Sequence, residues 1–421
     1  MTKTPQSVIV IGGGIIGLAS AHYLRQAGLQ VQVIDQGEIG QGCSHGNCGL
    51  ICPDHIMPLP RPGALRKGLS AMLKSNGPLS IEPGLNFRLW AWLFSFARNC
   101  NERKMIEAGK GRHAILHYSR EFYASFIEEN NIECDWEQNG CLFVYGSKKT
   151  LDAYDSIDRV LSEEHNLPAR KITGKELEEM EPAFIPGVAA GAWYYKQDAH
   201  LRADKLVAGW KNLLQQQDVE FIEHCEFRQF VTGGSSASAI MVQRKDAAEQ
   251  EEMKADAMIL STGAWTPLLN KELGCNIPIQ PGKGYSITMP RPKNCPRYPM
   301  ILEDEKVAIT PMQSGYRIGS TMQFAGYDSN IDPKRLSILK TGSKKYMREP
   351  YCEPIEETWY GWRPMTPNGL PIISHAPKLN NVVIAAGHNM IGLMSAPATG
   401  RHVAELLTNQ STSIDAAPYQ L

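Results

Sequence analysis

The sequence carries little net charge and no long apolar stretch. Its 43 Lys and Arg residues nearly balance its 44 Asp and Glu residues, which leaves a formal net charge of -1. A protein with this balance has no global attraction to polyphosphate, so nucleic acid is not an expected partner. No run approaches the roughly 18 uninterrupted apolar residues that span a bilayer. An integral membrane protein is therefore excluded, whereas a peripheral membrane contact stays open.

The sequence also lacks a leader segment and a paired-cysteine motif. Strand-like residues begin at Ser7, which leaves no room for a basic, then apolar, then small-residue signal peptide. The ten cysteines are scattered, and Cys43, Cys48 and Cys52 lack the CxxC spacing typical of zinc sites. We expect reduced thiols, no metal and a cytoplasmic protein, with contact at the inner face of the cell membrane left open.

A chain of 421 residues, 43% of them hydrophobic, is long enough for two domains. Near its start, an apolar run over residues 8–11 leads into glycines with G-x-G-x-x-G spacing. A helical pattern follows and stops at Gly28, as a left-handed cap would stop it. A second apolar run over residues 31–34 ends at Asp35. This arrangement predicts a complete β-α-β unit with a dinucleotide-binding fingerprint.

Each residue of this fingerprint has a physical role. Gly12 permits a tight turn, Gly14 lets the backbone approach a pyrophosphate, and Gly17 allows close packing of helix on strand. The helix N-terminus offers free N–H donors to the phosphates. Asp35 would accept hydrogen bonds from ribose hydroxyls. The unit alone does not choose between NAD and FAD.

Two distant segments bear on that choice. Residues 255–265, ADAMILSTGAW, resemble the second FAD-binding strand of flavoprotein oxidoreductases. Residues 382–386 are a further apolar run, followed by a glycine loop and a helical pattern. We expect Ser395 to be the N-cap of that helix and Pro397 to lie in its first turn. Such a helix start could face the pyrimidine end of a flavin, where negative charge develops on reduction.

The C-terminal residues carry a family resemblance. GHNMIGLMSAPATG, residues 387–400, resembles the closing motif of the D-amino-acid oxidase superfamily, in its glycine oxidase and D-amino-acid dehydrogenase branches. GWRPMTPNGLPIIS, residues 361–374, is similar to the Arg-Pro-x-Thr-Pro-Asp-Gly-Leu-Pro signature of that family, with Asn368 in place of Asp. GCSHGNCGLI, residues 42–51, and KGYSIT, residues 283–288, resemble the dehydrogenase branch.

The resemblance implies FAD-dependent oxidative deamination of a small amino acid, most simply a D-amino acid, by hydride transfer from the α-carbon to the flavin. Electrons would pass to a quinone or another carrier. The alternative is an oxidase of glycine, sarcosine or a cyclic imino acid such as proline or hydroxyproline, with oxygen as acceptor. Relatives that attach FAD do so through a Cys near the Arg-Pro segment, and this chain has none after Cys352. We therefore expect non-covalent FAD.

The resemblance also assigns site residues. Arg363 is expected to bind the substrate carboxylate through two parallel hydrogen bonds, with an ion pair to Glu356 or Glu357 as the structural alternative. Tyr285 could line the pocket or donate to the substrate, although a buried sheet tyrosine is as plausible. The expected cofactor-binding residues are Gly12, Gly14, Ile16, Gly17, Asp35, Ser44, His45, Asn47, Gly49, Phe227, Thr262, Gly263, Trp265, Gly387, His388, Gly392, Leu393 and Met394.

The predicted fold class is α/β, with a Rossmann-like FAD-binding domain and a discontinuous substrate domain built on a mixed β-sheet. Residues 1–90, 195–278 and 361–421 are assigned to the FAD-binding domain. Residues 91–194 and 279–360 are assigned to the substrate domain, in which alternating apolar residues over 285–289 indicate a half-covered strand. A retained flavin fold without catalysis, a tRNA-modifying relative and an NAD-dependent dehydrogenase are all disfavoured.

The segment 85–96, LNFRLWAWLFSF, is the most apolar-aromatic of the chain, and Arg88, Arg98 and Arg103 lie in or beside it. It could rest on a membrane surface, as suits an enzyme that passes electrons to quinone. A helix packed into the substrate domain is the favoured interpretation, because aromatic stripes more often belong to a core.

Overall fold

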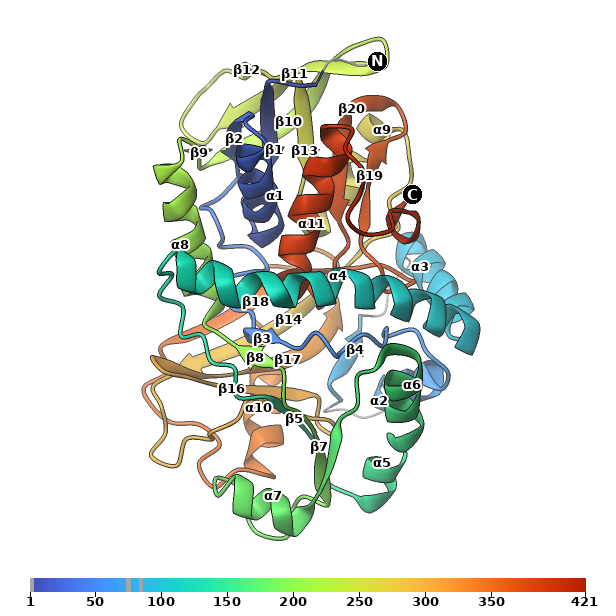
Figure 1. Ribbon diagram of the computed structural model, residues 1–421, viewed down its shortest axis with the longest axis vertical. Coiled ribbons are helices and arrows are strands. Elements are labelled where there is room, and N and C mark those ends of the chain that lie inside the picture. The colour runs from blue at the N-terminus through green and yellow to red at the C-terminus, as the bar shows by residue number, and fades with distance from the viewer. Residues whose placement is uncertain (1–3, 73–76, 83–85) are drawn as a thin grey trace.

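The computed structural model describes residues 4–72, 77–82 and 86–421. Two large sheets dominate these residues (Figure 1), one of six strands and one of nine. The long helix α4 (Glu102–Glu129) crosses the view between them. No helix of the described residues is long and apolar enough to cross a membrane.

The six-stranded sheet contains the predicted β-α-β unit. Its strand order is β19-β20-β13-β1-β2-β9, and all neighbours pair in parallel except β19. The strands are β1 (Ser7–Ile11), β2 (Gln30–Ile34), β9 (Glu220–Ile222), β13 (Ala257–Leu260), β19 (Ile372–Ala376) and β20 (Leu379–Ala386). Helix α1 (Ile15–Gln26) joins β1 to β2, and Gly28 follows it with φ +86, as expected of a left-handed stop. Strands from both ends of the sequence therefore meet in one sheet.

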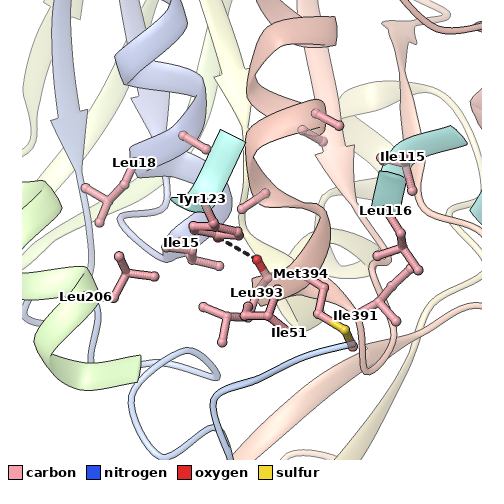
Figure 2. Packing of buried hydrophobic residues seen from close by; sticks show 14 of the residues in the cluster. Ile15, Leu18, Ile51, Ile115, Leu116, Tyr123, Leu206, Ile391, Leu393 and Met394 are labelled. Atoms are coloured by element: carbon pink, nitrogen blue, oxygen red, sulfur yellow. Dashed lines mark hydrogen bonds between the residues drawn. The ribbon is translucent and has the colours of Figure 1, made fainter. Parts of the chain in front are cut away.

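Helix α11 (Gly392–Leu407) starts earlier than the sequence indicated. Ile391 is its N-cap, so the predicted N-cap Ser395 is wrong, and its hydroxyl donates instead to the Ile391 carbonyl at 2.8 Å. Pro397 lies inside the helix rather than in its first turn. A proline has no N–H for the carbonyl four residues earlier, which belongs to Leu393. The Tyr123 hydroxyl of α4 donates to that carbonyl at 2.6 Å (Figure 2), and this bond makes an internal proline tolerable.

The buried contact between α1, α4 and α11 is the centre of the core around the six-stranded sheet. Tyr123 packs there among Ile15, Leu18 and Leu393, and all four side chains are buried (Figure 2). Gly400 of α11 approaches α1 so closely that a Cβ atom there would stand 2.3 Å from the Ala19 carbonyl oxygen. This packing fixes the N-termini of α1 and α11 relative to each other.

The nine-stranded sheet is mixed. Its order is β18-β14-β17-β16-β15-β5-β7-β6, and β4 pairs with β17 off this path. The strands are β4 (Leu79–Ile81), β5 (Cys141–Tyr145), β6 (Arg170–Thr173), β7 (Gly191–Tyr195), β14 (Gln280–Met289), β15 (Met300–Leu302), β16 (Val307–Met312), β17 (Gly315–Phe324) and β18 (Glu357–Met365). All ten residues of β14 are buried, so the predicted half-covered strand is wrong. Side chains of β14 have neighbours on both faces, where α10 (Pro333–Lys344) and the loop before β3 approach them.

Smaller elements complete the described chain. A three-stranded antiparallel sheet forms from β10 (Cys225–Gly233), β11 (Ser236–Arg244) and β12 (Glu251–Lys254). Strands β3 (Leu50–Ile51) and β8 (Ala199–His200) pair with each other. The other helices are α2 (Ala64–Met72), α3 (Phe87–Asn99), α5 (Lys148–Asp152), α6 (Asp155–His165), α7 (Gly174–Met180), α8 (Ala203–Gln216), η1 (Gly263–Leu269), α9 (Asn270–Leu273) and η2 (Ala417–Tyr419).

Helix α3 is buried on one side only. Leu89 and Trp92 are buried, and the Trp92 indole N–H donates to the Met365 carbonyl of β18 at 2.9 Å. The opposite side exposes Phe87 by 80%, Trp90 by 59% and Phe94 by 67%. The aromatic segment is thus packed against the nine-stranded sheet, as favoured, but it also presents three aromatic rings to its surroundings. Residue 85, where the predicted segment began, lies outside the described residues.

Candidate functional site

The glycine turn after β1 is shaped by close backbone contacts. Gly12 has φ +108, and a Cβ atom there would stand 2.5 Å from the Ser261 carbonyl oxygen. A Cβ atom on Gly17 would stand 1.9 Å from the Gly12 carbonyl oxygen. At Gly14, by contrast, the nearest atom to such a Cβ is the Ser44 hydroxyl at 3.5 Å, an ordinary contact. The fold itself therefore needs glycine at 12 and 17, whereas the space before Gly14 remains for a ligand.

Asp35 follows β2 with both carboxylate oxygens engaged by the backbone. The N–H groups of Gly13 and Gly37 donate to them at 2.7 and 2.9 Å. Burial raises the pKa of Asp35, and these N–H groups oppose that rise. Each oxygen keeps a further lone pair for a hydroxyl donor. The position suits the ribose of a dinucleotide, as the fingerprint predicted.

One cavity of about 640 Å³ runs along these residues. It is lined near one end by Asp35, Glu38 and Arg228, and elsewhere by Trp362 and Arg363 of β18. The predicted site residues that line it are Gly12, Gly14, Ile16, Asp35, Ser44, Asn47, Phe227, Thr262, Gly263, Trp265, Tyr285, Arg363, His388, Gly392, Leu393 and Met394. Gly17, His45, Gly49 and Gly387 stand outside this lining among the described residues.

The four remaining residues support the wall of the cavity. Gly49 has φ +70, and a Cβ atom there would stand 1.8 Å from the Leu201 carbonyl oxygen. Gly387 has φ +79, and a Cβ atom there would stand 2.6 Å from Thr366. His45 points to the nine-stranded sheet, where its Nε2 lies 2.7 Å from the Glu357 carboxylate. These residues shape the loops rather than face the cavity.

The loop over residues 43–49 is fixed at several points. The Ser44 hydroxyl accepts from the Ile15 N–H at 3.1 Å, which satisfies an amide at the start of α1. The buried Arg317 donates to the carbonyl oxygens of His45 at 3.2 Å and Asn47 at 2.7 Å, and it also pairs with Asp204 at 3.1 Å. Arg317 therefore holds the loop in place, and Asp204 neutralises its charge.

The loop after β20 is joined to the segment that carries Arg363. Asn389, with φ +53, accepts from the Thr366 N–H at 2.9 Å and donates to the Thr366 hydroxyl at 2.8 Å. Its own N–H donates to the Pro364 carbonyl at 3.0 Å. Asn368 accepts from the Leu370 N–H at 3.1 Å, a turn that the usual Asp of the signature would also make.

His388 is buried and has one polar neighbour of α11. Its Nε2 lies 3.0 Å from the Thr399 hydroxyl, which itself donates to the Ser395 carbonyl at 2.9 Å. Because that hydroxyl has a single hydrogen, His388 must donate through Nε2, and Nδ1 is left as the acceptor. Burial lowers the pKa of His388 to about 3, so the ring is neutral at physiological pH.

Arg363 is the cation that lies on the cavity without an acid beside it. Its guanidinium donates to the Thr321 carbonyl at 2.7 Å, and across residues 4–72, 77–82 and 86–421 it takes part in no ion pair. Glu357, one suggested structural partner, pairs with His45 instead. Burial lowers the pKa of Arg363, yet a guanidinium keeps its charge at any physiological pH. A buried guanidinium on the cavity wall without an acidic partner suits the binding of a carboxylate.

Tyr285 lines the cavity but lies on the other face of β14. Arg363 covers Gly284, and alternation of side chains along a strand puts Tyr285 on the opposite side. The Tyr285 hydroxyl donates to Gln323 at 2.5 Å, and burial raises the pKa of Tyr285 to about 12. Lys283 lies over the Tyr285 ring and pairs with Asp328 at 3.0 Å. The structure therefore does not bring the Tyr285 hydroxyl together with Arg363.

Several cavity residues were not assigned from the sequence, among them two tryptophans and two cysteines. Trp359 and Trp362 of β18 and Cys43 and Cys48 of the loop all line the cavity. A Cβ atom on Gly46 or Gly361 would stand within 2.3 Å of the Trp359 ring, so this indole is held between loop and strand. Trp362 lies within the quoted Arg-Pro motif and Trp359 just before it. Side-chain alternation along a strand could have indicated that Trp359 shares a face with Arg363 and that Trp362 shares a face with Pro364.

The cavity joins a glycine turn at a helix N-terminus, an acid at the end of the next strand and a second helix N-terminus. This combination defines a dinucleotide-binding oxidoreductase. The family model DAO, FAD dependent oxidoreductase, matches residues 7–406 of the chain. The chain belongs to this family, its cofactor is FAD, and the resemblance read from its motifs is confirmed.

Curated relatives cover almost the whole chain. The D-amino acid dehydrogenase of Xanthobacter autotrophicus is 30% identical over 97% of this chain and 97% of its own length. That of Vibrio vulnificus strain CMCP6 is 29% identical over 96% of each chain. Among solved structures, the glycine oxidase of Geobacillus kaustophilus matches with a TM-score of 0.78 and 20% identity, covering 99% of this chain and 98% of that chain. The L-proline dehydrogenase of P. horikoshii matches with a TM-score of 0.73 and 20% sequence identity, covering 99% of this chain and 97% of that chain. The predicted α/β fold with its mixed sheet is confirmed.

The described residues fit FAD. The open space before Gly14 suits a pyrophosphate at the N-terminus of α1, and Asp35 keeps lone pairs for the ribose. The second helix start, at Gly392–Met394, also lines the cavity. Bound FAD supplies the capacity to accept two electrons and a hydrogen from a substrate.

Proposed function

We propose that this protein oxidises the C–N bond of a small D-amino acid, with non-covalent FAD as the primary acceptor. One observation carries the proposal: Arg363 lies on the cavity wall with its charge unpaired by any described acid. A guanidinium binds a carboxylate through two parallel hydrogen bonds, which orients the bound molecule as well as holding it. The names of the curated relatives support the D-stereoisomer.

The residues around Arg363 position it, line the cavity and support its strands. Asn389 ties the strand of Arg363 to the loop after β20, so the substrate anchor and the cofactor wall keep a fixed spacing. Trp359, on the same face of β18 as Arg363, and Trp362, on the other face, both add apolar lining to the cavity, which favours a substrate with a small uncharged side chain and helps to exclude water. Tyr285 acts by supporting β14, through its bond to Gln323.

The electron acceptor is proposed to be a quinone or another membrane carrier. The exposed rings of Phe87, Trp90 and Phe94 support this choice, because such a stripe with Arg88 and Arg98 beside it suits an anionic bilayer surface. We place the protein in the cytoplasm, in peripheral contact with the inner face of the cell membrane. We also retain the division into an FAD-binding domain and a substrate domain as a proposal, and note that β18 crosses the boundary assigned at residue 361.

An anaerobic screen of D- and L-amino acids for bleaching of the flavin absorption tests the substrate. We expect D-amino acids with small side chains to bleach it and the L-forms to leave it oxidised. Bleaching by glycine, sarcosine, proline or hydroxyproline alone would favour the rival oxidase. A steady-state comparison of oxygen with artificial electron acceptors then separates the two classes, since faster turnover with oxygen contradicts a dehydrogenase.

A further inference from the structure

Three buried groups with metal-binding atoms meet behind the wall of the cavity. Cys52 directly follows β3, Cys141 begins β5, and Asp198 directly precedes β8. Their sulfur and carboxylate oxygen atoms all lie within 4.8 Å of one another. The residues are 1%, 0% and 0% exposed. Segments that are far apart in the sequence thus deliver two thiols and a carboxyl group to one enclosed point.

The carboxyl group of Asp198 stands out within this cluster. In the described part of the chain no N–H or O–H group donates to either of its oxygens, and the Cys52 thiol is the hydrogen-bonding group that acts on it. The backbone of Asp198 is paired, since its N–H donates to the Tyr195 carbonyl at 3.3 Å and its carbonyl accepts from the Gly140 N–H at 2.9 Å. The turn is therefore fixed, and the side chain points into the cluster. A buried carboxyl group with so few polar partners loses its hydration without full compensation, so a ligand that supplies a partner would stabilise it.

Neighbouring charges do not compensate for this group. Burial raises the pKa of Asp198, and the second buried acid nearby, Asp54, adds to this rise. The cation that acts on Asp198 is Arg120, whose guanidinium donates to Gln197 at the surface. The cluster therefore lacks positive charge.

We propose that Cys52, Cys141 and Asp198 bind a borderline-soft divalent cation of the Zn²⁺ class. Two sulfurs and one carboxylate oxygen form a ligand set typical of tetrahedral Zn²⁺, with a fourth position for water from the cavity, which Cys52 also lines. On binding, the two thiols and the protonated carboxyl group each lose a proton to solvent as the metal–sulfur and metal–oxygen bonds form, and no electron is transferred. Metal–sulfur bonds of about 2.3 Å need the sulfurs under about 4 Å apart, which small side-chain rotations provide.

The bound cation would join the two halves of the fold. Cys141 belongs to the nine-stranded sheet, whereas the Cys52 N–H donates to the Met394 sulfur at 3.2 Å, at the start of α11 in the cofactor wall. A metal between these groups would fix the cofactor wall against the second sheet. The site is independent of the proposed substrate, so its test does not depend on turnover.

The test uses the holoenzyme purified without chelator, incubated with Zn²⁺ or Co²⁺ and desalted. We expect one zinc per chain by elemental analysis. The cobalt form should show tetrahedral ligand-field absorption in the red, beyond the flavin bands. Wild-type protein that keeps no zinc and shows no red cobalt bands overturns the proposal, and the three groups are then protonated neighbours.

Variants assign the metal to these residues. Cys141→Ser and Asp198→Asn should each weaken zinc binding at least 100-fold, whereas Cys134→Ser, which removes another buried thiol, should keep the full content. Zinc content that stays at one per chain in both site variants also overturns the proposal. If a site variant does not fold, the wild-type stoichiometry and cobalt spectrum still decide.

Discussion

The guanidinium of Arg363 lies directly against the backbone of Gly284. A Cβ atom built on Gly284 would stand 2.3 Å from the Arg363 Cζ and Nη1 atoms and 2.4 Å from Nη2. The two residues belong to the antiparallel neighbours β14 and β18. The missing side chain of Gly284 is thus what lets the charged group rest flat on the sheet and face the cavity.

Gly284→Ala is expected to displace Arg363 without unfolding the protein. The methyl group would lift the guanidinium by an ångström or more, and a misplacement of that size can cost about 100-fold in rate. We expect kcat/KM to fall by about that factor, with FAD content retained. The matched control is Gly315→Ala in β17, where the nearest atom to a Cβ is 3.4 Å away. Equal kcat/KM in the two variants would show that the contact does not position Arg363.

Arg363→Lys and Arg363→Ala separate a carboxylate anchor from a structural cation. Lys keeps the charge but loses the two-pronged geometry, so it should be impaired, and Ala should be far worse. Removing one partner of a buried charge pair costs about 2 to 5 kcal/mol, or roughly 30-fold to several thousand-fold in kcat/KM. FAD content and melting temperature should barely change, because the lost partner is the substrate. Loss of flavin in the Ala variant would assign Arg363 to the fold instead.

The sequence predicts the β-α-β unit around the glycine turn and Asp35 more directly than the wall around Arg363. The glycine turn and Asp35 are local, since the acid follows the glycines by about 20 residues within one β-α-β unit. The wall around Arg363 depends on the pairing of β14, β17 and β18, strands that are separated by up to about 80 residues, and on which face of each strand looks inward. Tyr285 and Gly284 are adjacent in the motif, yet only the register shows that Gly284 shares a face with Arg363.

The error at α11 has a physical reason of the same kind. Ser395 and Pro397 suggest a helix start, because serine caps helices and proline is tolerated in a first turn. An internal proline is tolerated because the Tyr123 hydroxyl, 270 residues from Leu393 in the sequence, donates to the Leu393 carbonyl in place of the N–H that Pro397 lacks. No local pattern contains that information.

Gly14→Ala tests the phosphate site against the fold. The nearest atom to the added Cβ would be the Ser44 hydroxyl at 3.5 Å, so the apoprotein should keep its secondary structure. FAD binding should weaken at least tenfold, which is about 1.4 kcal/mol or more. Gly17→Ala should instead impair folding, because its Cβ would stand 1.9 Å from the Gly12 carbonyl oxygen. Circular dichroism and flavin content measure the two effects. A yellow Gly14→Ala protein with wild-type affinity would contradict the assignment.

The attachment of FAD is checked on the same preparations. Without a suitable cysteine after Cys352, acid precipitation of the wild-type protein should release all flavin into the supernatant. Flavin that stays with the precipitate would point to a covalent bond, and Cys43 and Cys48 on the cavity wall would then be the thiols to examine.

The exposed aromatic rings of α3 should bind lipid. Transfer of a large apolar side chain out of water is worth about 1.5 to 3 kcal/mol, so a Phe87→Ser/Phe94→Ser variant should lose at least tenfold in partitioning into anionic vesicles. Tyr351→Ser, which removes an exposed ring elsewhere, is the control. Cosedimentation measures the partitioning. Wild-type protein that stays in the supernatant at low salt would rule out α3 as a membrane contact.

His388 should make the free energy of unfolding fall as the pH drops. Its pKa is lowered by burial from 6.5 to about 3, so the unfolded chain binds a proton at pH values where the folded protein does not. Stability is therefore full above about pH 6.5 and falls as the pH drops toward 3. At pH 5 the loss of folding free energy from this one residue is about 2 kcal/mol.

His22 and His55, whose pKa values burial lowers to about 4, contribute in the same direction. The effect of His388 must therefore be measured by comparing the wild-type protein with a variant of His388 alone. His388→Gln keeps a donor for Thr399 but cannot be protonated, and urea midpoints at pH 5 and pH 7.5 should lie closer together in this variant than in the wild-type protein. If the two proteins lose equal stability between these pH values, His388 is already protonated in the fold and the neutral ring assigned to it is wrong.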